Sequence, residues 1–122
     1  MRKTILSAIF LAALAAPALA DSYPVSGKWG QSASSEKGPI DCGKLRVIAF
    51  NGDQRTDSKG GVPAYRNKSV TPDGPMRYRV VDEFTTGQIG NARASYTLRQ
   101  VDDDHLELNM QPGGVLKLQR CK

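Results

Sequence analysis

The sequence is poor in the side chains that build metal and cofactor sites. Its 122 residues hold one histidine, two cysteines and one tryptophan. The single histidine, His105, does not by itself make a metal site of the usual kind. The acidic run before it, residues 102–104, lacks the glycine and the distant glutamate of a calcium-binding EF-hand loop. We therefore predict no metal site and no cofactor.

Catalytic motifs are missing as well. No serine lies in a Gly-x-Ser-x-Gly elbow, and neither Gly60-Gly61 nor residues 87–90 have the pattern of a phosphate loop. Asp82 and Glu83 are consecutive in a predicted strand, so they face opposite sides and do not form a carboxylate pair. These absences favour a protein that is not an enzyme and has no catalytic residues.

A long hydrophobic run is found only at the N-terminus. Arg2 and Lys3 precede an apolar stretch over residues 5–16, and small residues follow up to Ala20. This order is typical of a secretory signal peptide over residues 1–20, with cleavage between Ala20 and Asp21. The apolar stretch is too short to span a bilayer of about 30 Å. We expect a periplasmic or secreted mature chain, residues 21–122, with one domain and no transmembrane segment.

Charge of one sign is not concentrated along the mature chain. Removing Arg2 and Lys3 with the signal leaves 15 basic side chains against 12 acidic ones. The basic residues occur singly in the sequence, whereas nucleic-acid binding usually needs a clustered stripe. Nucleic acid is therefore not an expected partner, and we expect a monomer.

The two cysteines, Cys42 and Cys121, lie far apart in a chain expected to be exported. An isolated pair in an oxidising compartment usually forms a bond, so we predict an internal disulfide. It would close a loop of about 80 residues, worth roughly 4–5 kcal/mol in the chain-entropy model. A mixed disulfide between two chains and a catalytic thiol are the alternatives, although no Cys-x-x-Cys motif is present.

Short runs with a period of two, separated by turn residues, fill the mature chain, and no long segment has helical periodicity. Asn51-Gly52 is a strong signal for a hairpin turn. These patterns predict about eight antiparallel strands, best closed as a small up-and-down β-barrel, with a two-sheet β-sandwich as the alternative. The predicted strands cover residues 28–33, 45–50, 54–58, 65–70, 76–85, 91–101, 105–110 and 115–121.

The predicted disulfide conflicts with a simple meander. Cys42 precedes the second strand and Cys121 ends the eighth, so the two cysteines fall at opposite ends of the barrel. A strand of six residues is about 20 Å long, while bonded cysteines have Cα atoms within about 7 Å. Either the loop over residues 34–43 folds back along the wall, or the strand count is off by one, or the bond is not internal.

Gly27-Lys28-Trp29 on the first strand and Arg120 on the inward side of the last resemble the lipocalin and wider calycin barrels. Those barrels open with a Gly-x-Trp motif and end with an arginine packed across the indole at the closed end. The resemblance implies that Gly27, Trp29 and Arg120 form the barrel floor, with a cation–π contact worth roughly 0.5–2 kcal/mol. It also implies a small apolar ligand in the barrel mouth.

The outline is also similar to small periplasmic inhibitors of secreted metalloproteases, which are short exported barrels with an early tryptophan and one disulfide. In that family an N-terminal arm enters the protease cleft, and residues 21–26 would be that arm here. The family's cysteines lie close together in the N-terminal half, unlike Cys42 and Cys121.

The sequence therefore predicts an exported, non-enzymatic binding module. Its partner would be a small apolar ligand in a lipocalin-like barrel or a secreted or periplasmic protein on the rim. A metalloprotease inhibitor acting through the N-terminal segment is the first alternative, and an envelope structural protein is the second.

Overall fold

A computed structural model describes residues 22–86, 88 and 90–122. The predicted signal peptide and its cleavage site between Ala20 and Asp21 lie outside the described residues. The all-β class with eight antiparallel strands is confirmed, and no helix occurs in the described part of the chain. The strands are β1 (Gly27–Gln31), β2 (Val47–Asn51), β3 (Gln54–Asp57), β4 (Tyr65–Pro72), β5 (Arg77–Phe84), β6 (Ala92–Asp102), β7 (His105–Met110) and β8 (Gly114–Arg120).

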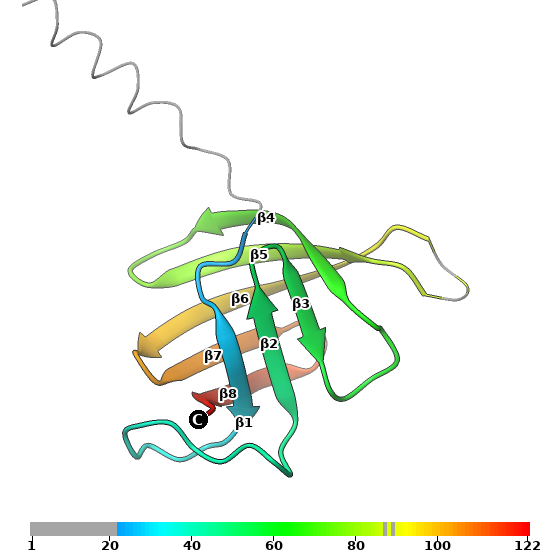
Figure 1. Ribbon diagram of the computed structural model, residues 1–122. Coiled ribbons are helices and arrows are strands. Elements are labelled where there is room, and N and C mark those ends of the chain that lie inside the picture. The colour runs from blue at the N-terminus through cyan, green and yellow to red at the C-terminus, as the bar shows by residue number, and fades with distance from the viewer. Residues whose placement is uncertain (1–21, 87, 89) are drawn as a thin grey trace, which may run out of the picture.

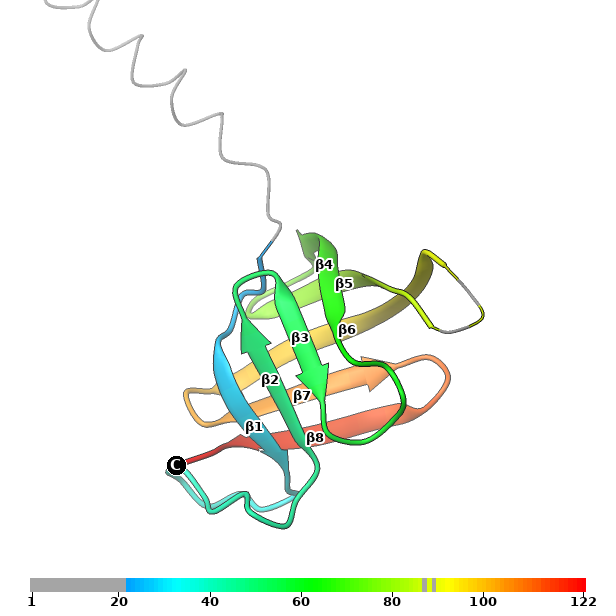
Figure 2. The same cartoon turned by 45° about the vertical axis from the view of Figure 1, so that its right-hand side comes forward.

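The eight strands form a closed barrel in which each strand pairs with its neighbours in the sequence (Figure 1). β1 also pairs antiparallel with β8, where Trp29 lies opposite Arg120. Figure 2 shows β1, β2 and β3 crossing in front of β6, β7 and β8. The two-sheet sandwich is therefore the wrong alternative, because closure leaves no unpaired edge strand.

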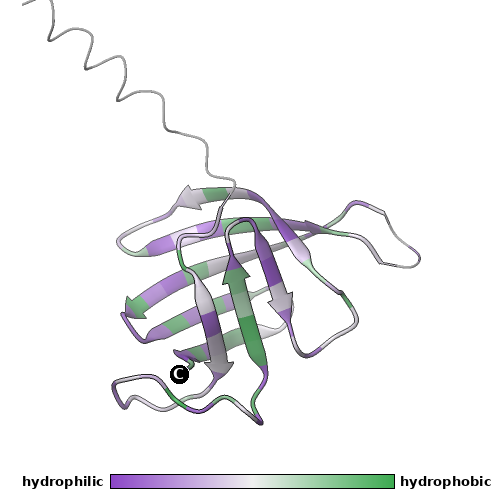
Figure 3. Ribbon diagram, in the orientation of Figure 1, coloured by the Kyte–Doolittle hydropathy of each residue, from purple (hydrophilic) through white to green (hydrophobic). Residues whose placement is uncertain are grey.

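Period-two alternation places the core inside the barrel. Polar and apolar residues alternate along β6, β7 and β8, whereas β2 is mostly apolar (Figure 3). Each strand turns alternate side chains inward, so one face of every strand contributes to the same interior. The buried apolar residues are Tyr23, Val25, Trp29, Ile48, Phe50, Val80, Tyr96, Leu98, Leu106, Leu108, Leu116 and Leu118.

The first hairpin turns one residue later than the sequence predicts. Asn51 pairs with Gln54, so the turn residues are Gly52 and Asp53. Gly52 has a φ of 65°, while Asn51 remains in β2. A turn with glycine at its first central position needs positive φ only there, which explains the shift. The shift brings Arg55 opposite Phe50.

The long β1–β2 loop resolves the conflict over the disulfide. The Cys42–Cys121 bond is present, with Cα atoms 5.6 Å apart, and the barrel keeps its eight strands. The loop folds back along the outside of the barrel, where Ile40 forms a parallel bridge to Cys121. The Ile40 N–H donates to the Arg120 carbonyl (2.9 Å), and the Ile40 carbonyl accepts from the Lys122 N–H (2.9 Å). The first of the three explanations is therefore the correct one.

Two residues of the barrel wall accommodate this returning loop. Gln119 points outward yet is fully buried, and its Nε2 donates to the carbonyls of Glu36 (2.9 Å) and Gly38 (3.0 Å). Gly30 faces the disulfide, and a Cβ at this position would lie 2.5 Å from Cys42 Sγ. The loop and the disulfide therefore cover one part of the outer wall, at the β1–β8 seam.

Reducing the disulfide tests how much this seam depends on it. Because the bonded cysteines are separated by 79 residues, we expect the reduced chain to lose up to about 4–5 kcal/mol of unfolding free energy. Urea denaturation of the oxidised chain and of Cys42→Ser/Cys121→Ser measures the difference. Equal midpoints for the two proteins would show that the loop is held by its hydrogen bonds alone.

Candidate functional site

The three residues assigned to the barrel floor lie together. The Arg120 guanidinium carbon is 4.4 Å from the centre of the Trp29 ring, and Trp29 is fully buried. Arg120 also donates from Nε (3.0 Å) and Nη2 (2.7 Å) to the Asp103 carbonyl. Gly27 has a φ of 94°, and a Cβ there would lie 3.8 Å from the guanidinium. Arg120 thus covers the indole and also bonds to the β6–β7 turn, so it has a structural role at this end of the barrel.

A charged pair inside the barrel was not among the predicted site residues. Arg55 of β3 and Asp82 of β5 both point inward, with exposed side-chain fractions of 2% and 0%. Arg55 Nε donates to Asp82 Oδ2 at 2.8 Å. Burying two charges costs several kcal/mol per ion unless they are paired and further hydrogen-bonded. The pair therefore depends on the groups that surround it.

Further hydrogen bonds complete the environment of the Asp82 carboxylate. Tyr23 donates to Oδ1 (2.9 Å) and Tyr96 donates to Oδ2 (2.9 Å). Asn67 Nδ2 lies 3.4 Å from Oδ1. The carboxylate accepts on both oxygens from groups on four segments of the chain, so the cluster joins the segment before β1 to strands β3, β4, β5 and β6. We call these five residues, Tyr23, Arg55, Asn67, Asp82 and Tyr96, the interior cluster.

Aromatic rings lie over the Arg55 side chain of the ion pair. The Arg55 guanidinium carbon lies 3.8 Å from the centre of the Tyr65 ring and 5.1 Å from that of Tyr96. Such cation–π contacts are strongest when the cation is desolvated, as it is here. Tyr65 in turn packs edge-on against Phe84, with ring centres 5.0 Å apart. The interior at this level is occupied by the protein's own side chains.

The interior cluster shifts the ionisation of its tyrosines. Burial is the main cause that raises the pKa of both Tyr23 and Tyr96, and the neighbouring Asp82 carboxylate raises both further. Arg55 acts in the opposite direction on both hydroxyls but does not outweigh burial. The tyrosines therefore stay protonated donors, and none of these groups is an accessible acid or base for a substrate.

The segment before β1 takes part in this cluster. Tyr23 and Val25 are 8% and 9% exposed, and the Tyr23 N–H donates to the Gly52 carbonyl (2.9 Å). Tyr23 also packs edge-on against Phe50, with ring centres 4.9 Å apart. The described residues of the expected free arm, from Ser22 to Ser26, therefore lie against the barrel, and Tyr23 and Val25 belong to its core.

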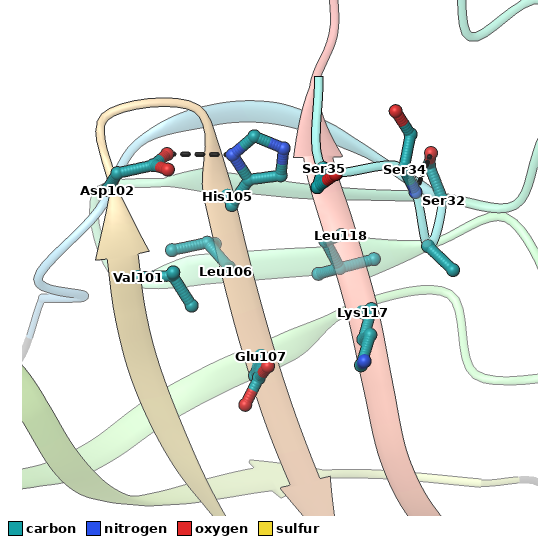
Figure 4. A pocket seen from close by; sticks show the side chains of 11 residues that line it. Ser32, Ser34, Ser35, Val101, Asp102, His105, Leu106, Glu107, Lys117 and Leu118 are labelled. Atoms are coloured by element: carbon teal, nitrogen blue, oxygen red, sulfur yellow. Dashed lines mark hydrogen bonds and ion pairs between the residues drawn. The ribbon is translucent and has the colours of Figure 1, made fainter. Parts of the chain in front are cut away.

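A shallow pocket of about 180 Å³ lies on the outer face, between the start of the β1–β2 loop and the strands β6, β7 and β8 (Figure 4). His105 Nδ1 lies 2.8 Å from Asp102 Oδ1, and His105 Nε2 is buried without a hydrogen-bond partner. The bond to His105 lowers the pKa of Asp102, and the Asp104 N–H lowers it further. Since the Asp102 carboxylate accepts, His105 Nδ1 carries the hydrogen and Nε2 is an acceptor when the ring is neutral.

Two serines of this pocket, Ser32 and Ser34, have hydroxyls that are hydrogen-bonded within the β1–β2 loop or to β8. Ser32 Oγ donates to Gln119 Oε1 (3.1 Å) and accepts from the Ser34 N–H (3.2 Å). Ser34 Oγ accepts from the Glu36 N–H (3.0 Å). No hydrogen bond joins either hydroxyl to His105 in the described chain. The Asp102 carboxylate accepts from the Asp104 N–H and bonds to His105, so this pair orders the acidic β6–β7 turn.

Comparison with known proteins gives no significant match: no protein-family model, no curated protein and no solved structure matches this chain. In the described residues, no three His, Cys, Asp or Glu side chains are grouped so that they could hold a metal ion. The described residues also contain no helix long and apolar enough to cross a membrane.

Removing the charge of Asp82 tests the interior cluster. Asp82→Asn leaves the Arg55 guanidinium buried without a counter-ion, and we expect the unfolding free energy to fall by about 3–5 kcal/mol. Asp73→Asn is the matched control, because Asp73 is exposed in the β4–β5 turn, and it should change stability by less than about 0.5 kcal/mol. Chemical denaturation measures both. Equal effects of the two substitutions would argue against a structural role for the buried pair.

The shifted tyrosines predict an alkaline limit to stability. The folded-state pKa values of Tyr23 and Tyr96 lie above the unfolded value near 10, so the folded chain keeps protons that the unfolded chain loses. Their contribution is fully present below about pH 10 and decreases as the pH rises above it. Tyrosinate absorbance of the wild type, compared with Tyr23→Phe and Tyr96→Phe, identifies these two hydroxyls. Their ionisation should accompany unfolding, and ionisation of either one in a chain that keeps its near-UV circular dichroism would contradict the account.

Proposed function

We propose that this chain is an exported, non-enzymatic binding module that engages its partner on the outside of a lipocalin-like barrel. The observation that carries the proposal is the filled interior. The hydrogen-bonded interior cluster crosses it at one level, and apolar side chains including Trp29, Leu98 and Leu108 pack the rest. An eight-stranded barrel is narrow enough to be filled in this way. An apolar ligand inside would have to displace a buried ion pair.

Two further observations support the class. The eight-stranded closed barrel, with Trp29 covered by Arg120, fits a lipocalin-like fold used as a rigid scaffold. The Cys42–Cys121 bond fits an oxidising, exported setting. Within the interior cluster the ionisable groups bond to one another, and in the β6–β7 turn Asp102 bonds to His105. These contacts support a binding role over a catalytic one.

Inhibition of a metalloprotease through the N-terminal segment has less support. A segment that enters a protease cleft has to leave its own barrel, yet Tyr23 and Val25 are core residues. Removing residues 21–26 takes away one donor to Asp82 and the buried side chains of Tyr23 and Val25, so we expect the truncation to destabilise the barrel by at least about 3 kcal/mol. Thermal or urea unfolding of the truncated chain checks this. Unchanged stability would make the segment a free arm and favour the inhibitor.

An apolar-probe titration tests the proposal. Fatty acids and benzene-sized probes should cause no saturable change in the fluorescence of Trp29, the only tryptophan. Leu98→Ala is the matched positive control, because truncating this buried side chain leaves an apolar cavity of the kind that takes up benzene. A saturable one-to-one response of the wild type to a fatty acid would overturn the proposal and support a ligand inside the barrel.

A further inference from the structure

The barrel gathers basic residues that the sequence scatters. The outer sides of β4, β5 and β6, which are neighbours in the barrel (Figure 1), hold six exposed basic side chains. The acidic residues facing outward from these strands are Glu83 and, at the end of β6, Asp102, which is bonded to His105. The basic residues of this face are Arg66, Lys68, Arg77, Arg79, Arg93 and Arg99.

Three arginines toward one end of this face lie close together, near the start of β5 and the end of β6. Arg77 is directly opposite Arg99 in the β5–β6 pairing, and Arg79 is the next outward residue along β5. Like charges directly opposite in an antiparallel pair are destabilising. An exposed cross-strand pair of arginines thus carries a stability cost, for which an anionic partner between the guanidinium groups would compensate.

The acidic groups facing these arginines neutralise only part of their charge. Glu107 Oε1 lies 3.0 Å from Arg99 Nη1. Arg77 Nε donates to the carbonyl of Asp73, whose carboxylate also borders the face. Arg79 has no hydrogen-bond or ion-pair partner among the described residues. Elsewhere on the face Glu83 lies 3.6 Å from Arg93, and Asp53 lies 3.9 Å from Arg66. Two guanidinium groups, those of Arg77 and Arg79, are left without a carboxylate partner.

The same face is hollowed. Two shallow hollows of about 550 and 290 Å³ lie over β5, β6 and β7 and share Thr97 and Asn109 in their linings. Arg77 and Arg99 line the first, and Arg79 lines the second. Hydroxyl and amide side chains also line the two hollows: Ser95, Thr97, Asn109 and Gln111. We call this continuous depression the arginine groove.

We propose that the arginine groove binds an extended acidic polysaccharide, with its sulfate, phosphate or carboxylate groups on Arg77, Arg79 and Arg99. This assignment rests on the proposed function, that of a module binding on its outer surface. Guanidinium groups bind such anions through paired N–H donors. The hydroxyl and amide side chains between them can donate to and accept from sugar hydroxyls.

Two other polyanionic partners fit the groove less well. The exposed large hydrophobic residues of the described chain are Leu45, Met76, Val101 and Val115, and none of them is aromatic. Single-stranded nucleic acid binds on aromatic platforms that stack its bases. Protein interfaces are anchored by buried tryptophan, tyrosine and arginine in apolar surroundings. Val115 is the one exposed large hydrophobic residue among the groove's described lining residues, and Tyr96, which also lines it, is only 4% exposed. A partner held mainly by charge and hydrogen bonds therefore matches this surface better.

The test uses the full mature chain and heparin as the acidic polysaccharide, by calorimetric titration in low-salt buffer. Arg79→Glu breaks no contact within the described protein and reverses one charge at the groove. Lys59→Glu makes the same change of net charge in the β3–β4 loop. We expect Arg79→Glu to weaken heparin binding by at least about tenfold, since each hydrogen bond to a charged group is worth on the order of one such factor. Lys59→Glu should weaken it by less than about twofold.

Equal losses of heparin affinity in the two variants would show that only net charge matters and would overturn the assignment of the arginine groove as the binding site. Tighter binding of a single-stranded oligonucleotide of equal charge would assign the groove to nucleic acid instead. If the wild type binds neither heparin nor an apolar probe, the inference fails while the proposed outer-surface function stands. A fatty acid that binds inside the barrel would contradict the proposed function and, with it, the inference that rests on it.

Discussion

The buried ion pair between Arg55 and Asp82 is the interaction on which the rest of the structure depends. It places two charges where neither reaches water, and so obliges the chain to surround them with donors and rings. The hydroxyls of Tyr23 and Tyr96 supply the donors, and the ring of Tyr65 covers the cation. These groups come from the segment before β1 and from β3, β4, β5 and β6. One electrostatic requirement therefore ties the segment before β1 to four successive strands of the barrel.

The other half of the barrel is held by different means. At the β1–β8 seam the first and last strands pair, Arg120 covers Trp29, and the disulfide fixes the returning loop. Gln119 holds the same loop from the outer wall. The seam joins the two ends of a meander, where loop-closure entropy is greatest, and the covalent bond is placed there. The closed barrel is thus held at the seam by strand pairing, side-chain packing and a covalent bond.

Much of the fold could be predicted because local patterns decide it. Period-two alternation and turn residues located the eight strands, and their number and the need to cover exposed edges favoured closure. The isolated cysteines predicted the disulfide, although the path of the β1–β2 loop could not be derived, since it depends on tertiary contacts of Gln119 and Ile40. The one-residue shift of the first turn depends on backbone geometry at Gly52 that a dipeptide signal does not resolve.

The interior cluster left a signal in the sequence that period-two analysis alone did not interpret. Asp82 is the one acidic residue on an otherwise apolar side of its strand. Arg55 falls on the same side as Ile48 and Phe50 in the predicted register as well as in the observed one. What the sequence could not give is their pairing, because β3 and β5 are not neighbours in the barrel. The arginine groove was missed for a different reason: β5 and β6 are neighbours in the predicted meander, but the placement of Arg77 opposite Arg99 depends on the exact register of their pairing.

A double-mutant cycle on Arg55→Met and Asp82→Leu tests the central claim most directly. Each single substitution leaves one buried charge without its partner, so each should cost about 3–5 kcal/mol of unfolding free energy. The double variant removes both charges and should cost no more than either single change, giving a coupling energy of at least about 3 kcal/mol. Additive losses, with a coupling energy below about 0.5 kcal/mol, would show that the barrel does not depend on this ion pair.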